Sequence, residues 1–167
     1  IGGDEVDASY WKACPHCSAL YHKEGMSDHH QLQEYFMNRL VAILEHNGKK
    51  AAMWNEATDG GRLSHKVRIH GWEGLEECRK VAEAGYPAVV MPGPYFYFDM
   101  RQSKHEDGHN WAGVVTLEKC YSVNLDALGY SAAAKGSIVG FSGAFWSELY
   151  LTHSHKYENY LEYQTFP

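Results

Sequence analysis

The chain has 167 residues, of which 44% are hydrophobic and 14% aromatic, and it carries a formal net charge of -6 at pH 7. This length suffices for one domain with a buried core. The acidic balance and the lack of a basic run argue against a protein that binds nucleic acid or anionic membrane surfaces, and no apolar run approaches the roughly 20 residues that span a bilayer.

The aromatic residues, among them 5 tryptophans and 12 tyrosines, are more numerous than an ordinary core needs. They indicate either a surface that stacks on a flat or sugar-like ligand or a tyrosine-rich core.

The first six residues read IGGDEV, so that two glycines lead directly into the adjacent carboxylates Asp4 and Glu5. The stretch reads as the end of a strand followed by a loop. Neighbouring carboxyl groups at such a position can divide acid and base roles between them. The alternative is a helix N-terminus, where the helix dipole favours acidic residues.

The next motif is CPHC, with Cys14 and Cys17 in a C-x-x-C spacing. The chain has only two further cysteines, Cys78 and Cys120, which are too few for a disulfide scaffold. Three readings of CPHC stay open: half of a zinc site, a redox pair, or ordinary buried or loop cysteines.

Helices and strands alternate after this motif. Residues 30–48 predict a helix with Leu32, Phe36, Leu40, Ile43 and Leu44 at helical spacing, a capping box formed by Asp28 and Gln31, and a stop at Gly48. Residues 73–85 predict a second helix, with Leu75, Cys78, Val81 and Ala82 facing inward and a stop at Gly85. Strands are predicted within residues 49–56, 65–72, 86–92 and 136–148.

This alternation predicts an α/β fold with a parallel sheet, and residues 1–167 read as one continuous unit. Polar and aromatic side chains recur where each predicted strand ends. Because parallel strands share one rim at their carboxyl ends, we expect these side chains to meet there. They are Asp4 and Glu5, Trp54 with Asn55 and Glu56, Trp72 with Glu73, Tyr97 with Asp99, and Trp146 with Glu148.

Taken in order, the blocks IGGDEV, WNE, GW, YFDM and GFSGAFWSE resemble glycoside hydrolase family 20, the β-N-acetylhexosaminidases. The resemblance implies a (β/α)8 TIM barrel, of which this chain would be the C-terminal part, an incomplete barrel that starts at the end of the fourth strand. A full barrel takes roughly 250 residues. We therefore expect the isolated chain to be inactive or badly impaired.

The resemblance also implies roles for individual residues. Glu5 matches the general acid and base, and Asp4 the residue that orients the substrate's acetamido group, whose own oxygen attacks the anomeric carbon. The remaining matches bind the sugar: Trp54, Trp72 and Trp146 enclose the acetamido methyl, Tyr97 bonds its carbonyl, Asp99 and Glu148 bind ring hydroxyls, and Trp111 stacks on the next sugar.

Several alternatives stay open at this stage. Each tryptophan could belong to the barrel core, Trp111 could be loop filler, and Tyr95 could replace Tyr97 if the register slips by two. Asn55 and Glu56 could support the site or simply lie on a polar rim.

For the whole molecule, the resemblance implies glycans or chito-oligosaccharides that contain N-acetylhexosamine as partners, and neither a cofactor nor a metal ion. The sequence does not give the compartment, and a secreted, periplasmic or cell-surface protein is slightly favoured over a cytoplasmic one. A family variant that releases a disaccharide such as lacto-N-biose is one alternative. Another is a non-catalytic half-barrel that only binds sugar and forms a homo-oligomer or associates with the missing N-terminal half.

Overall fold

A computed structural model of the protein describes residues 1–147. Its centre is a sheet of four strands in the order β1-β2-β3-β4, in which every neighbouring pair is parallel. The strands are β1 (Ala52–Trp54), β2 (Arg68–Gly71), β3 (Ala88–Val90) and β4 (Ile138–Phe141). All four coincide with predicted strands, and the predicted α/β class with a parallel sheet is confirmed.

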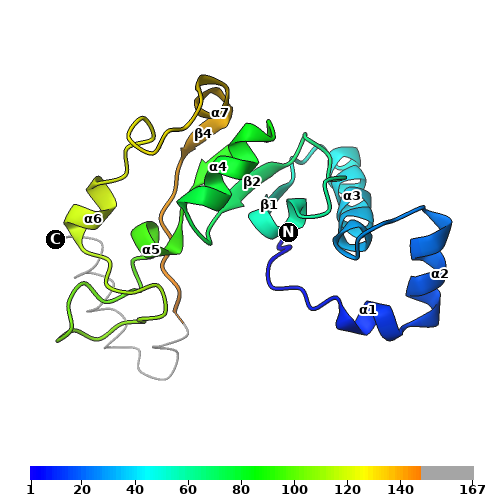
Figure 1. Ribbon diagram of the computed structural model, residues 1–167, viewed down its shortest axis with the longest axis horizontal. Coiled ribbons are helices and arrows are strands. Elements are labelled where there is room, and N and C mark those ends of the chain that lie inside the picture. Colours follow the sequence, from blue (N-terminus) through cyan, green and yellow to red (C-terminus); the bar gives the residue numbers. More distant parts are fainter. Residues whose placement is uncertain (148–167) are drawn as a thin grey trace.

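Helices lie between the strands and around them (Figure 1). The two predicted helices are present as α3 and α4, whereas the other helices were not predicted. The helices of the described residues are α1 (Ser9–Ala13), α2 (Pro15–Lys23), α3 (His30–His46), the 3-10 turn η1 (Asn55–Thr58), α4 (Leu75–Glu83), α5 (Gly93–Phe96), α6 (Leu117–Tyr121) and α7 (Ala132–Ser137).

One apolar core joins the sheet to the helices that pack on it. Met53 of β1, Ile69 of β2 and Ala88 of β3 are almost fully buried against side chains of α3 and α4. β3 is buried on both faces and entirely apolar, as is usual for a strand inside a parallel sheet. By contrast, β2 also carries Arg68 and His70, and alternate residues of β4 are exposed. The remaining buried members of this core are Met37, Val41, Ala51, Ala57, Leu63, Val67, Val81, Ala82, Tyr86, Tyr130 and Ala134.

Both predicted helix stops are confirmed. At the end of α3, Gly48 has a φ of 67° and the amide of Lys49 donates to the carbonyl of Leu44 over 2.8 Å. At the end of α4, Gly85 has a φ of 85° and the amide of Tyr86 donates to the carbonyl of Val81. Each helix therefore ends in a left-handed residue followed by a bond back into the last turn.

The start of α3 differs slightly from the predicted capping box. The Gln31 side chain accepts from the amide of Ser27 rather than that of Asp28, and Asp28 accepts from the amide of His30 over 2.7 Å. Both side chains still satisfy amides at the helix start, but the reciprocal pair of a capping box is not formed, because the helix begins at His30 and His29 occupies the N-cap position.

The buried face of α3 also differs from the predicted apolar stripe. Leu32 is buried as expected and Leu40 and Leu44 pack at the core's edge, but Phe36 and Ile43 are 57% and 58% exposed. The inward face instead carries Met37 and Val41 together with two polar residues, Gln33 and Glu34. The reason is local, since both polar side chains hold loop backbone.

Gln33 and Glu34 each bond a different loop. The Gln33 amide donates to the carbonyl of Gly3 over 2.7 Å, and the Glu34 carboxylate accepts from the amide of Arg62, also over 2.7 Å. Burial raises the pKa of Glu34, while bonds from the amides of Arg62, Gly61 and Gly60 lower it. These bonds offset part of the desolvation penalty, although Oε1 of Glu34 is buried without a hydrogen-bond partner.

No helix within residues 1–147 is both long enough and apolar enough to cross a lipid bilayer.

The contact between β2 and α4 leaves no room for a side chain at Gly71. A Cβ there would lie 2.5 Å from Sγ of Cys78 and 3.1 Å from its Cα. We expect Gly71→Ala to lower the free energy of unfolding by about 1–3 kcal/mol, because the backbone of α4 must move to accommodate the methyl group.

Urea unfolding of the chain, followed by tryptophan fluorescence, measures this loss. Gly136→Ala is the matched control, because Gly136 lies in α7 and a Cβ there meets nothing within 4 Å. We expect it to be neutral or slightly stabilising. Equal unfolding midpoints for the two variants would contradict the close contact.

Candidate active site

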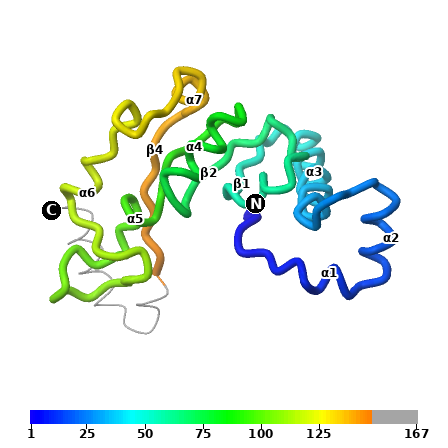
Figure 2. The backbone as a smooth tube through the Cα atoms, viewed as in Figure 1, coloured from blue at the N-terminus to red at the C-terminus, as the bar shows by residue number. Residues whose placement is uncertain are grey.

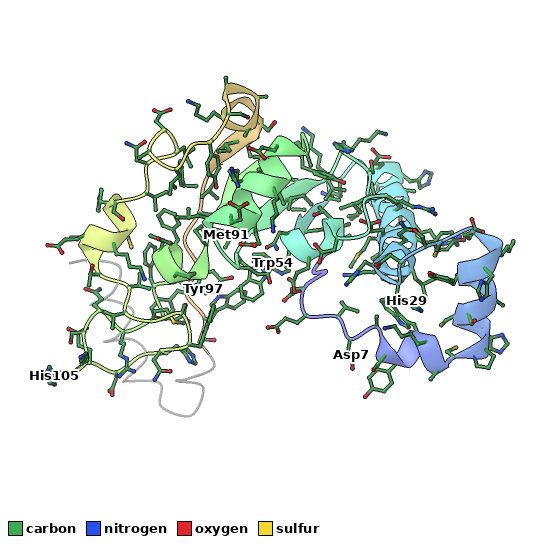
Figure 3. The ribbon with its side chains drawn as sticks, viewed as in Figure 1. Asp7, His29, Trp54, Met91, Tyr97 and His105 are labelled. Atoms are coloured by element: carbon green, nitrogen blue, oxygen red, sulfur yellow. The ribbon has the colours of Figure 1, made fainter. Side chains whose placement is uncertain are left out.

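A cavity of about 260 Å³ lies at the carboxyl ends of the strands. Two of its lining residues, Trp54 and Tyr97, are labelled in Figure 3. The full lining consists of Asp4, Glu5, Trp54, Trp72, Tyr97, Trp111 and Trp146. The structure thus brings together both predicted catalytic acids and five of the predicted sugar-binding residues.

The parallel strands place the rings at this rim. Trp54 is the last residue of β1, and Trp72 directly follows β2. Tyr97 comes after β3 and the single turn of α5, and Trp146 follows β4. The segments of the last two rings meet again beyond the sheet, where Tyr97 forms a parallel bridge with Ala144. Strand direction alone therefore gathers the four rings on one side.

The rings form one connected apolar wall. Tyr97 is at its centre, with ring centroids 6.5 Å from Trp72, 5.7 Å from Trp111 and 5.9 Å from Trp146. Trp54 joins the wall through Trp146, at 6.2 Å between centroids. Edge-to-face and offset contacts at these separations are favourable for aromatic pairs. The wall suits a small apolar group such as a methyl group.

The two acids are carried by backbone that runs beside β1 (Figure 2). The amino group of Ile1 donates to the carbonyl of Ala52 over 2.7 Å, and the amide of Trp54 donates to the carbonyl of Gly2 over 3.1 Å. These two bonds match the predicted position of IGGDEV at the end of a strand, although residues 1–8 form no regular strand. Asp4 and Glu5 are both exposed.

Glu5 is held in an uncommon backbone conformation. Its φ is 51°, and among residues 1–147 it is the one residue other than glycine with a positive φ. Such left-handed residues persist where the surroundings impose them, and they gather at functional sites. Here the amide of Glu5 donates to Oε1 of Glu56 over 2.8 Å.

Glu56 connects this acidic loop to the aromatic wall. Its second carboxylate oxygen accepts from Nε1 of Trp72 over 2.9 Å. Next to it, Asn55 accepts from the amide of Trp72 over 3.1 Å and donates to the carboxylate of Glu73. These bonds favour the interpretation that Asn55 and Glu56 support the site over the interpretation that they only lie on a polar rim. The bonds themselves could not be predicted, and only the position of WNE at a strand end pointed to them.

The structure also decides between the two tyrosines. Tyr97 is 4% exposed and lines the cavity, whereas the ring of Tyr95 lies elsewhere, 5.2 Å from Nζ of Lys119. Burial raises the pKa of Tyr97, and the negative charges of Asp99, Asp4 and Glu5 raise it further. The hydroxyl therefore keeps its proton and can donate a hydrogen bond into the cavity.

Three predicted residues need separate mention. Trp111 is 54% exposed at the edge of the cavity, where its ring lies over Gly93. Asp99 is buried at 1% exposure and does not line the cavity, so its contact with a sugar stays a prediction. Glu148 lies outside the residues that the structure describes.

Within residues 1–147, no three histidine, cysteine, aspartate or glutamate side chains come together in a way that could hold a metal ion. The zinc reading of CPHC therefore has no third ligand in this part of the chain.

Comparison with known proteins identifies the family. The model of the glycosyl hydrolase family 20 catalytic domain matches residues 1–167. A β-hexosaminidase from Vibrio furnissii is 32% identical over 152 residues, which cover 89% of this chain and 25% of that protein. A β-hexosaminidase from Porphyromonas gingivalis is 29% identical over 100% of this chain and 21% of its own length.

Solved structures agree in fold. The family 20 exo-β-N-acetylglucosaminidase from Vibrio harveyi, determined in complex with N-acetylglucosamine, superimposes with a TM-score of 0.82 and 30% identity, over 100% of this chain and 26% of that one. A β-N-acetylhexosaminidase from Bacteroides fragilis gives a TM-score of 0.77 at 26% identity, over 100% of this chain and 33% of its own.

The chain thus spans between 21% and 33% of the length of these relatives. The structures of this family are TIM barrels, and the four parallel strands described here form part of one, as the resemblance implied. Sequence, fold and the matched family model agree: the chain belongs to glycosyl hydrolase family 20.

Proposed function

We propose that this chain supplies the acid pair and most of the acetamido pocket of a β-N-acetylhexosaminidase. Such an enzyme removes terminal, non-reducing N-acetylhexosamine from glycans with retention of configuration. One observation carries the proposal: a single cavity joins the adjacent carboxylates Asp4 and Glu5 to a wall of four indoles and a buried tyrosine. The N-acetylglucosamine complex of the Vibrio harveyi relative supports the substrate class.

The proposed reaction uses the substrate's own amide as nucleophile. The acetamido oxygen bonds to the anomeric carbon while the glycosidic bond breaks, and Glu5 gives its proton to the departing oxygen. This forms a cyclic oxazolinium ion. Water then attacks the same carbon, Glu5 takes a proton from the water, and the ring bond to the acetamido oxygen breaks. Each of the two attacks inverts the configuration of the anomeric carbon, so the product has the configuration of the substrate.

The other lining residues would orient the amide. Asp4 would accept from the acetamido N–H and stabilise the positive charge of the intermediate, and the protonated Tyr97 hydroxyl would donate to the acetamido oxygen. The indoles would pack on the methyl group and exclude water. Holding the attacking oxygen near the anomeric carbon turns the step into an oriented intramolecular reaction, for which effective molarities of about 10⁵–10⁸ M are known.

A second behaviour is favoured by the surface of the chain. Phe36 and Ile43 on α3, and Val139 and Phe141 on β4, are all more than half exposed. In a complete barrel, further strands and helices would cover these residues. We propose that the chain by itself covers them by self-association or by binding the rest of the barrel, and that it then turns over substrate poorly or not at all.

Substrate choice tests the proposed mechanism. A complete family 20 barrel that contains this chain should cleave a chromogenic β-N-acetylglucosaminide and leave the matching β-glucoside intact, because the glucoside lacks the attacking amide. The isolated chain should elute from gel filtration as an oligomer and show little activity. Equal rates on the two substrates would refute the substrate-assisted mechanism, and full turnover by the isolated chain would refute the second proposal.

Substitutions of Asp4 and Glu5 in the same complete barrel test the separate roles proposed for the two acids. Glu5→Gln should lower kcat/KM by about 10²–10⁴-fold, because the general acid is lost. Asp4→Asn should impair hydrolysis and also weaken binding of a thiazoline that mimics the intermediate. Asp7→Asn, at another exposed carboxylate of this loop, is the control and should keep wild-type rates. Tight thiazoline binding by Asp4→Asn would contradict the role of Asp4.

Glu56 should act by positioning both partners of its carboxylate. A glutamine at this position keeps one acceptor but turns an amide group toward the other N–H. We expect Glu56→Gln to lower kcat/KM by about 10–100-fold, the scale of one charge-assisted hydrogen bond of about 1.5–3 kcal/mol. The indole N–H signal of Trp72 should shift in NMR spectra, a change that general destabilisation would not produce in a folded protein.

The control for this variant is Glu118→Gln, at an exposed glutamate of α6. It should change neither the rate nor the Trp72 signal. Wild-type kinetics together with an unshifted Trp72 signal in Glu56→Gln would show that Glu56 does not position the site.

A further inference from the structure

The two cysteines of CPHC lie at the corner between α1 and α2, at the end of the molecule away from α6 (Figure 1). Cys14 is in an extended conformation and caps both helices: its amide donates to the carbonyl of Trp11 at the end of α1, and its Sγ accepts from the amide of Cys17 over 3.5 Å at the start of α2. Pro15 occupies the first position of α2. Neither cysteine lines the proposed active site.

Both thiols of this corner are accessible. Cys14 and Cys17 are partly exposed, and a separate cavity of about 290 Å³ opens beside Cys17, between Trp11, Tyr21 and His29. The corner is therefore open to small molecules.

The thiols of the other two cysteines, Cys78 and Cys120, each donate a hydrogen bond to a backbone carbonyl. Cys78 is 1% exposed and donates to the carbonyl of Gly71, and Cys120 donates to the carbonyl of Tyr95 over 2.7 Å. The chain thus carries one partly exposed pair of cysteines, one buried cysteine, and Cys120, which is partly exposed but bonded to a backbone carbonyl.

We propose that Cys14 and Cys17 form a redox-active dithiol that reduces low-molecular-weight disulfides, with Cys14 as the attacking thiolate. This chemistry lies outside the proposed glycosidase function and does not depend on it. Cysteines three residues apart on one helical turn face the same side, so that their sulfurs can reach each other.

The exchange balances in two steps. The Cys14 thiolate attacks one sulfur of the small disulfide, forming a mixed disulfide at Cys14 and releasing one thiolate. Cys17 then loses its proton and attacks Sγ of Cys14, which forms the Cys14–Cys17 disulfide and releases the second thiolate. The dithiol gives up two electrons and two protons, and the small disulfide becomes two thiols.

The electrostatics of the corner favour this order of attack. The amide of Cys17 hydrogen-bonds Sγ of Cys14 and lowers the pKa of that thiol, helped by the Cys17 side chain and the amide of His16. The same pairing raises the pKa of Cys17. Burial raises the pKa of Cys78 to about 12 and also raises that of Cys120. A helix N-terminus stabilises a thiolate at its cap, as in other reactive cysteines.

The other readings of CPHC fit the structure less well. Two cysteines alone do not complete the four-ligand shell of a structural zinc ion, and within residues 1–147 no further ligand joins them. Ordinary core cysteines would be buried, as Cys78 is, and these two are not.

Mass spectrometry of the reduced chain after reaction with excess oxidised glutathione tests the proposal. Wild type should lose two hydrogens and give a peptide with a Cys14–Cys17 disulfide and no bound glutathione. Cys17→Ser should retain one glutathione on Cys14, because the second step is blocked. Cys14→Ser should react at Cys17 about tenfold more slowly. The control Cys120→Ser should behave like wild type.

A second measurement separates reactivity from a folding defect. In urea, where α2 is lost, the two single variants should react at equal rates, so that the tenfold difference belongs to the folded corner. The proposal is overturned if glutathione stays on both cysteines of wild type, or if Cys17 reacts as fast as Cys14 in the folded chain. Protection of both thiols by an equimolar amount of Zn²⁺ would overturn it as well.

Discussion

The parallel pairing of four strands is the constraint on which the site depends. Every neighbouring pair in the sheet runs in the same direction, so the carboxyl ends of all four strands open onto one rim. Trp54, Trp72 and Trp146 reach one cavity because each lies at or beyond the carboxyl end of a different strand. No local feature of the chain would bring these three indoles together. The apolar core beneath the rim fixes the strand positions, and through them the positions of the rings.

Polar groups then determine the fine geometry of the acids. Gln33 holds the carbonyl of Gly3 from a buried position on α3, and Glu56 holds the amide of Glu5 from the turn after β1. The backbone of the acid pair is thus fixed from two elements, and Glu5 is kept in a left-handed conformation that an unsupported loop would leave. Because the same Glu56 carboxylate also binds Trp72, it fixes the position of Glu5 relative to the aromatic wall. A glycosidase needs such preorganisation, since the amide nucleophile must meet the anomeric carbon as the leaving group receives its proton.

The corner between α1 and α2 follows the acid pair directly in sequence, yet its chemistry is separate. At the corner, the start of a helix stabilises a negatively charged sulfur. At the rim, the ends of parallel strands bring aromatic rings and carboxylates together. Burial of Cys78 and the hydrogen bond from Cys120 to the carbonyl of Tyr95 distinguish these two thiols from the pair at the corner. The two proposed sites thus rest on different elements of secondary structure within residues 1–147.

The sequence alone determined the strands, the helices α3 and α4 with their glycine stops, and the positions of Trp54 and Trp72 at strand ends. These features depend on apolar periodicity and on residues close together in the chain. Only the tertiary structure decided that Phe36 and Ile43 face outward, that Tyr97 rather than Tyr95 enters the cavity, and that Glu56 binds both Glu5 and Trp72. Those outcomes depend on which segments, far apart in the sequence, lie close together in space. Glu5 and Glu56 are 51 positions apart, and no local pattern records a hydrogen bond over that separation.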